Sequence, residues 1–267
     1  MIKTKPIFYP ENHTYVNRMG VNYKPVTSFI HGFCKEEDWV SIAQKFIDKR
    51  TPAQIVDEIS SKYKLNIATV YEKFKTDGFT PETVMYFWDL EKNRSCNDGS
   101  EFHANQEDND IKYNGAKSNV ETDYIYDLYE LNDGVYTELM IWDDDYLICG
   151  KSDKVIIETD NKGDRYISIQ DYKTNKDLKI NYNFINKRTN EKVINKFMLS
   201  PISHLVDCNY IHYCLQLSMY GFLLERKGFI VKDLELLHTN NYSKDNLKSY
   251  KLPYLKSEII NMLNNGI

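Results

Sequence analysis

The stretch "ICGKSDKVIIETDNKGDRYISIQDYK", Ile148 to Lys173, reads as two strands joined by a turn at "DNKGD". Side chains of a strand alternate between its two faces. In the second strand, Asp171 and Lys173 therefore share a face with the isoleucines that precede them. In the first strand, Asp153 likewise stands where the alternation calls for an apolar residue. A lone D-x-K is usually a surface ion pair, but charges are costly to remove from water unless they are paired or coordinate something. The second carboxylate makes a polar site the better interpretation.

The hairpin would bring Asp153 and Asp171 side by side on adjacent antiparallel strands. Two neighbouring carboxylates repel each other and raise one pKa unless a cation lies between them. Oxygen ligands favour Mg²⁺ or Mn²⁺. Such an ion activates water for phosphodiester hydrolysis. Lys173 would orient that water or stabilise the transition state. The pattern thus predicts a Mg²⁺- or Mn²⁺-dependent catalytic site.

These parts resemble the PD-(D/E)XK nuclease superfamily, which places one carboxylate and D/E-x-K on the two strands of a hairpin. The Pro and Asp of the motif's name are replaced here by "GKSD", which ends at Asp153. The resemblance implies an α/β restriction-endonuclease-like core, with a mixed central sheet flanked by helices. It also implies that the backbone carbonyl of Tyr172 is a metal ligand.

Three further motifs are similar to those of the exonuclease branch, the RecB, AddB and lambda-exonuclease-like proteins. The motif "GSEFH" ends at His103, which the resemblance makes an additional metal ligand. The motif "ELMIW" begins with Glu138, and "QLSMY" contains Gln216 and Tyr220; the resemblance gives all three a role in supporting the site or positioning DNA. The motifs also follow the order expected of that branch. The N-terminal "HTYV" and "YKPVTSFI" resemble phage-encoded members.

Each of these residues has an ordinary structural interpretation when taken alone. His103 would be a helix-end or core histidine, and Glu138 a strand-end carboxylate. Gln216 and Tyr220 would be helix surface and core edge. Glu107 follows His103 by one helical turn, so it could reach the same metal or simply solvate that face. Their order and spacing together favour the nuclease site.

The charge distribution is uneven along the chain, although the net charge is only −5. Residues 98–145 contain 14 acidic and 2 basic side chains, whereas residues 173–196 contain 7 basic and 2 acidic ones. Basic residues after the D-x-K strand could contact a DNA backbone, which would make binding salt-dependent, or could be ordinary solvated surface. They are Lys176, Lys179, Lys187, Arg188, Lys192 and Lys196.

The chain is expected to form one α/β domain over residues 1–267. A hairpin and helical elaboration would occupy residues 1–97, and the catalytic core residues 98–267, with an insertion at about 177–206. Alternation and turn signals predict strands, and apolar spacing predicts helices. The expected strands cover 136–141, 146–157, 165–173 and 231–238; the expected helices cover 38–75 in pieces, 81 to about 107, 208–227 and 255–263.

Composition places limits on the cellular setting. Hydrophobic residues make up 42% and charged residues 27%, as in soluble globular proteins. Apolar runs long enough for a membrane span and a secretory h-region are both missing from the sequence. Five scattered Cys indicate reduced thiols and argue against an iron–sulfur or zinc site. A cytoplasmic protein, in the host cytoplasm if phage-encoded, with no membrane partner is therefore expected.

The motifs predict a metal-dependent DNA exonuclease that leaves 5′-phosphate and 3′-hydroxyl ends during phage DNA replication, recombination or processing. DNA is the expected partner, with a recombination or replication protein as a second one. Two alternatives stay open. One is a catalytically silent DNA-binding or assembly protein on a nuclease fold. The other is a structure-specific or nicking endonuclease, because the motifs determine the chemistry better than the substrate geometry.

Overall fold

The computed structural model describes residues 5–9, 11–12, 14–118, 127–180, 196–243 and 246–265, and the backbone alone of 183–185 and 192–194. The chain divides into two compact units. The larger unit consists of Met1–Lys35 and Phe102–Ile267, and the smaller one is Glu36–Glu101. The helix α5 (Pro81–Asn114) begins in the smaller unit and ends in the larger one.

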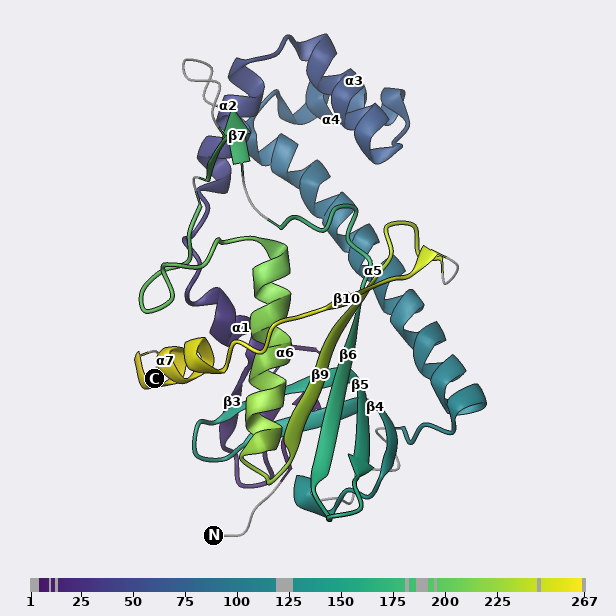
Figure 1. Cartoon of the computed structure of the whole chain (residues 1–267). Helices are drawn as coiled ribbons and strands as arrows, with labels where there is room; N and C mark the ends of the chain where they lie inside the picture. The colour runs from purple at the N-terminus through teal and green to yellow at the C-terminus, as the bar shows by residue number, and fades with distance from the viewer. Residues whose placement is uncertain are drawn as a thin grey trace. The chain divides into compact units, whose positions relative to one another are not determined.

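The larger unit is built on a mixed, eight-stranded sheet (Figure 1). Its strands β3 and β5 pair in parallel, as do β6 and β9, whereas the other pairs are antiparallel. This arrangement confirms the predicted α/β class and the predicted strands, and it adds two short ones, before the N-terminal hairpin and at residues 248–251. In spatial order the strands are β1 (Ile7–Tyr9), β2 (Thr14–Val16), β3 (Asn22–Pro25), β5 (Ile148–Thr159), β6 (Arg165–Lys173), β9 (Ile230–His238) and β10 (Lys248–Lys251), with β4 (Gly134–Asp143) also paired to β5.

The sheet opens next to the middle of β5. One edge of β5 pairs with β4 from Ile148 to Ile157. The other edge pairs with β3 only at its first two residues and with β6 only from Lys154 onward. Within the described strands, residues 150–153 therefore have no strand beside them on that edge. The strand β6 stays paired with β9 as far as Lys173, so β5 and β6 separate beside Asp153.

The helix α6 (Asn209–Glu225) forms the centre of the core on one face of this sheet (Figure 1). Every residue from Cys214 to Leu224 is buried, as expected of a helix that is enclosed on all sides. It packs against β4, β6 and β9, and against the helices α1 (Val26–His31) and α7 (Lys256–Asn265). The predicted 208–227 and 255–263 helices are thus confirmed.

The insertion contains a small antiparallel pair, β7 (Asn183–Ile185) and β8 (Lys192–Ile194). Its predicted tip, with Lys187 and Arg188, lies outside the described residues. Upstream of it, α5 confirms the predicted helix through His103 and Glu107.

The smaller unit is helical, as predicted for residues 38–75. It comprises α2 (Trp39–Asp48), α3 (Pro52–Tyr63), α4 (Ile67–Asp77) and the first part of α5. A capping box between Thr51 and Gln54 starts α3, with Pro52 as its first residue. The helices enclose their own apolar core. Among the described residues, the helices lack the combination of length and apolar character that crossing a membrane requires.

Candidate metal centre

A histidine and two carboxylates from three different elements meet where the sheet opens. They are His103 of α5, Glu138 of β4 and Asp153 of β5, and their ligand atoms all lie within 4.8 Å of one another. His103 Nδ1 lies 3.2 Å from Asp153 Oδ2. Oxygen and imidazole donors gathered in this way can hold a divalent cation.

Glu138 reaches this group through an unusual backbone conformation. Thr137 pairs with Lys154, and Leu139 pairs with Ser152, so Glu138 lies opposite Asp153 at an interruption of the ladder. Its φ is 50°, in the left-handed region that non-glycine residues seldom adopt. Residues held in such regions occur preferentially at functional sites. The sequence predicted only a supporting role for Glu138. In the structure, its carboxylate belongs to the group whose ligand atoms lie within 4.8 Å of one another, together with His103 and Asp153.

The predicted D-x-K pair is present beside this group. Asp171 is 1% exposed, and its Oδ2 lies 2.5 Å from Lys173 Nζ. Its other oxygen accepts a hydrogen bond of 3.4 Å from Gln216 Nε2. The ammonium also lies 5.1 Å from the centre of the Tyr213 ring. Residues of α6 thus contact both members of the pair: Gln216 contacts Asp171, and Tyr213 lies beside Lys173.

The surroundings of Asp153 and Asp171 shift the pKa values of the two carboxyl groups in opposite directions. Burial raises the pKa of Asp171 to about 6; the charge of Lys173 opposes this rise and that of Asp153 adds to it. Burial also acts to raise the pKa of Asp153, but the hydrogen bond and charge of His103 outweigh it and leave that pKa below its usual value. A cation between the two would favour the ionised form of both.

The backbone of Tyr172 faces the opening. Its N–H donates a 2.7 Å hydrogen bond to Asp153 Oδ2 in place of a bond to the neighbouring strand. One residue later, the carbonyl of Lys173 accepts from Thr239, which follows β9. Because successive residues of a strand direct their backbone groups to opposite edges, the carbonyl of Tyr172 faces β5. This is the side that its predicted role as a ligand requires.

The two motif residues of α6 hold the edges of the opening. Gln216 contacts Asp171, as described above, while the Tyr220 hydroxyl donates a 2.9 Å hydrogen bond to the carbonyl of Lys151. That carbonyl belongs to the segment of β5 that has β4 on one edge and none of the described strands on the other. A Cβ at Gly150 would lie only 2.7 Å from Tyr220 Oη. The glycine of "GKSD" thus leaves room for this contact.

Asp110 was not singled out in the sequence, yet it connects α5 to both central strands. Its Oδ1 lies 2.8 Å from Lys154 Nζ on β5, and its Oδ2 accepts a 3.3 Å hydrogen bond from the Tyr172 hydroxyl on β6. The spacing of His103, Glu107 and Asp110 puts all three on one helical face, which was the signal available. These two contacts tie the face of α5 that also carries His103 to the sheet.

Glu107 also lies on this face. Its Oε1 accepts a 3.4 Å hydrogen bond from the hydroxyl of Thr137, the neighbour of Glu138. Burial raises the pKa of Glu138, and the charges of Asp153 and then Glu107 raise it further. Glu107 is therefore close enough to influence the donor group, as its helical spacing from His103 suggested.

The predicted phosphate contacts are only partly described. Lys176 and Lys179 follow β6, and the backbone N–H of Lys179 donates a 2.7 Å hydrogen bond to Asn209 at the start of α6. For Lys192 the structure describes the backbone alone. Lys196 Nζ lies 3.4 Å from Asp207, so this lysine pairs with a buried carboxylate. The phosphate surface remains a prediction.

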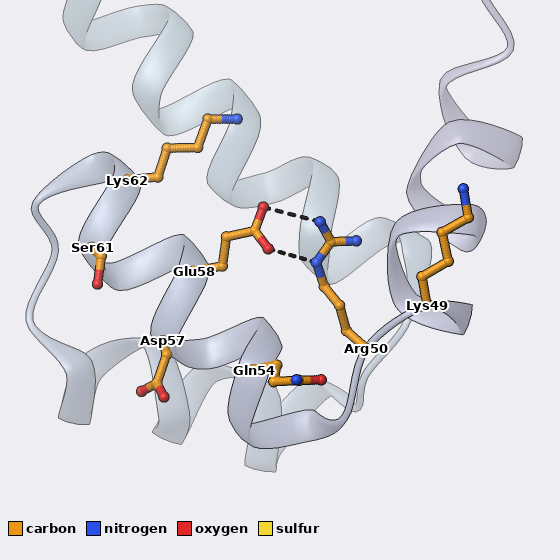
Figure 2. A pocket seen from close by; sticks show the side chains of 7 residues that line it. All are labelled: Lys49, Arg50, Gln54, Asp57, Glu58, Ser61 and Lys62. Atoms are coloured by element: carbon orange, nitrogen blue, oxygen red, sulfur yellow. Dashed lines mark hydrogen bonds and ion pairs between the residues drawn. The ribbon is translucent and has the colours of Figure 1, made fainter. Parts of the chain in front are cut away.

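The smaller unit has a surface hollow of its own (Figure 2). Arg50 and Glu58 form a two-pronged ion pair there, with N–O distances of 2.6 and 3.1 Å. The charges of its lining are mixed, which does not favour an anionic ligand. The lining residues are Lys49, Arg50, Gln54, Asp57, Glu58, Ser61 and Lys62.

Comparisons with protein-family models, with curated proteins and with solved structures found no match to this chain. The opening between β5 and β6 combines a histidine and several carboxylates with a buried ammonium. Such a group can hold a divalent cation and place a positive charge beside it, which is chemistry suited to an anionic substrate.

Proposed function

We propose that the chain is a metal-dependent DNA nuclease with a PD-(D/E)XK-like core, similar to the RecB-like exonuclease branch. The observation that carries this proposal is the donor group of His103, Glu138 and Asp153 beside the Asp171–Lys173 ion pair. DNA is proposed as the substrate because the motifs follow the order expected of that branch. A role in phage DNA replication, recombination or processing belongs to the same proposal, as does a recombination or replication protein as partner.

The donor set fits Mg²⁺ or Mn²⁺, because it offers carboxylate oxygens and a single imidazole. His103, Glu138 and Asp153 would hold the ion, with Asp171 and the carbonyl of Tyr172 approaching from β6. When bound, the ion would lower the pKa of a water molecule and offset negative charge on the phosphate.

Lys173 would supply the second positive charge. Burial acts to lower its pKa, but the charges of Asp171 and Asp153 outweigh burial and raise the pKa above its ordinary value. The ammonium therefore stays protonated at neutral pH, where it can donate to a phosphate oxygen or orient the attacking water. In-line attack would leave a 5′-phosphate and a 3′-hydroxyl.

The supporting residues would keep these groups in position. Gln216 holds Asp171 through its side-chain amide, and Tyr220 holds the free edge of β5 at Lys151. Asp110 ties α5 to Lys154 and to the Tyr172 hydroxyl. Preorganised groups of this kind lower the reorganisation needed during reaction.

The inactive binding protein is the rival from another class. The ion pair of Asp171 and Lys173 and the group around Asp153 are complete, which favours turnover over a silent site. The endonuclease alternative differs only in which bonds of DNA reach the site.

The test is cleavage of end-labelled linear duplex, single strand and closed circular plasmid with Mg²⁺ or Mn²⁺. Lys173→Ala should lower the rate by about 10²–10³-fold, as for loss of one transition-state donor. Lys232→Ala is the matched control, because Lys232 forms an exposed pair with Glu158. Degraded linear DNA with intact circles indicates an exonuclease, and nicked circles indicate the endonuclease. Bound but uncut DNA in both metals would favour the silent protein.

A further inference from the structure

A second donor group, separate from the proposed nuclease site, lies between the end of α1 and the start of α6. Its members are Cys34, Asp207 and His212, and their ligand atoms all lie within 4.8 Å of one another. Cys34 Sγ is 3.4 Å from His212 Nε2, and Asp207 Oδ1 is 2.8 Å from the same nitrogen. All three residues belong to the larger unit.

The carboxylate of this group is an interior one. Asp207 is 1% exposed, and its backbone N–H bonds to the carbonyl of Lys196. Lys196 Nζ lies 3.4 Å from Oδ2, so Oδ1 is the oxygen directed at the imidazole. Burying an ionised carboxylate is costly unless it is paired or coordinates a metal. Lys196 supplies that pairing at Oδ2, and Oδ1 is left beside the thiol and the imidazole.

The geometry argues against a nucleophilic triad. In a triad, the acid binds one ring nitrogen of the histidine and the nucleophile faces the other. Here Asp207 and Cys34 both approach Nε2 of His212. The histidine cannot take a proton from the thiol at a nitrogen that the carboxylate already shares. A thiol, an imidazole and a carboxylate whose ligand atoms all lie within 4.8 Å of one another are instead a set that one ion could bind.

We infer that Cys34, Asp207 and His212 form a binding site for one Zn²⁺ ion or a chemically similar transition-metal ion. Tetrahedral bonds of about 2.3 Å to sulfur and 2.0 Å to nitrogen place those two atoms about 3.5 Å apart. The observed separation between Cys34 Sγ and His212 Nε2 is 3.4 Å. The N–O pair at 2.8 Å would need to open slightly. A water or a further side chain would fill the fourth position.

The mixture of sulfur, nitrogen and oxygen donors separates this site from the proposed nuclease centre, whose donors suit Mg²⁺ or Mn²⁺. The spacing of the cysteines did not indicate this site, because only one of its three residues is a cysteine. The other two, Asp207 and His212, lie near the start of α6, far along the chain from Cys34. Bound metal would tie the turn after α1 to the first turn of α6, which is the helix that carries Gln216 and Tyr220.

The experiment is a titration of the full-length, chelator-treated protein with Co²⁺, followed by visible and near-ultraviolet absorption. One equivalent should give tetrahedral cobalt bands with a thiolate charge-transfer band, and Zn²⁺ but not Mg²⁺ should displace it. Cys34→Ser should remove the thiolate band. His212→Gln should weaken Co²⁺ binding by at least about tenfold. Cys96→Ser is the matched control, because Cys96 is exposed and outside the group.

The Asp153→Asn, Asp171→Asn double variant should keep the thiolate band, which makes the result independent of the nuclease proposal. Circular dichroism would show whether each variant folds; if Cys34→Ser does not, the affinities of His212→Gln and Asp207→Asn provide the test. Absence of a thiolate band in the folded wild-type protein would overturn the inference. A band of unchanged intensity and affinity in folded Cys34→Ser would overturn it as well.

Discussion

The hydroxyl oxygen of Tyr220 lies 2.7 Å from the place where residue 150 would carry a Cβ if it were not glycine. This relationship joins two motifs that are far apart in the chain, "GKSD" and "QLSMY". The hydroxyl satisfies the carbonyl of Lys151 at the free edge of β5. Tyr220 of α6 therefore covers the edge of β5 beside the opening, and the fit depends on both residues.

Gly150→Ala should lower the free energy of unfolding by about 1–3 kcal/mol, the usual cost of overpacking. Tyr220→Phe alone should cost about 1 kcal/mol through loss of the hydrogen bond to Lys151. In the Tyr220→Phe background, Gly150→Ala should cost less than in the wild type, because the nearest clashing atom is gone. Chemical unfolding of the four proteins measures this coupling; strictly additive effects would contradict it.

Asp110→Asn should destabilise the larger unit by about 3 kcal/mol, because it leaves the half-buried ammonium of Lys154 without its charged partner. Asp108→Asn is the matched control on the same helix. Asp108 is exposed, so this change should stay within about 0.5 kcal/mol.

Replacing both partners, with Asp110→Leu and Lys154→Met, should restore part of the lost stability, since no unpaired charge is then buried. The same series tests the positioning of His103. Asp110→Asn should weaken Mn²⁺ binding even at temperatures where the variant is fully folded, whereas Asp108→Asn should not. Equal Mn²⁺ affinities in the two variants would argue that Asp110 has only a structural role.

Mn²⁺ should raise the melting temperature of the wild-type protein, since a ligand that binds only the folded state stabilises it by about 2.7 kcal/mol at 100 times its dissociation constant. Asp153→Asn should lose this increase, because it removes one of the three carboxylate and imidazole groups proposed to hold the ion. Glu158→Gln, on the same strand but in an exposed pair with Lys232, should retain it. A full increase in Asp153→Asn would exclude Asp153 as a ligand.

Much of the core was predictable from local patterns. Alternation along 148–173 predicted both strands and put Asp171 and Lys173 on one face, and the structure pairs them at 2.5 Å. Helical spacing from Pro81 carried α5 to His103 and Glu107. These features depend on neighbours in sequence, which the chain itself displays.

Other features depend on contacts that local patterns do not encode. The left-handed φ of Glu138 follows from the interrupted ladder beside Asp153, not from the sequence "ELMIW". The opening lies where β6 stays paired with β9 but no longer with β5, and a parallel partner is distant in sequence. The role of Asp110 needed the positions of Lys154 and Tyr172. The group around Cys34 required the packing of α1 against α6.

The most direct test of the central claim is the initial rate of DNA phosphodiester hydrolysis as a function of Mn²⁺ concentration, for the wild type and Asp171→Asn. The wild-type rate should saturate over the concentrations that raise its melting temperature. Asp171→Asn should fold but hydrolyse at least about 10²-fold more slowly, since it removes the carboxylate that the proposed function places beside the ion. Wild-type turnover in folded Asp171→Asn, or hydrolysis that persists in chelator, would contradict a metal-dependent nuclease at this site.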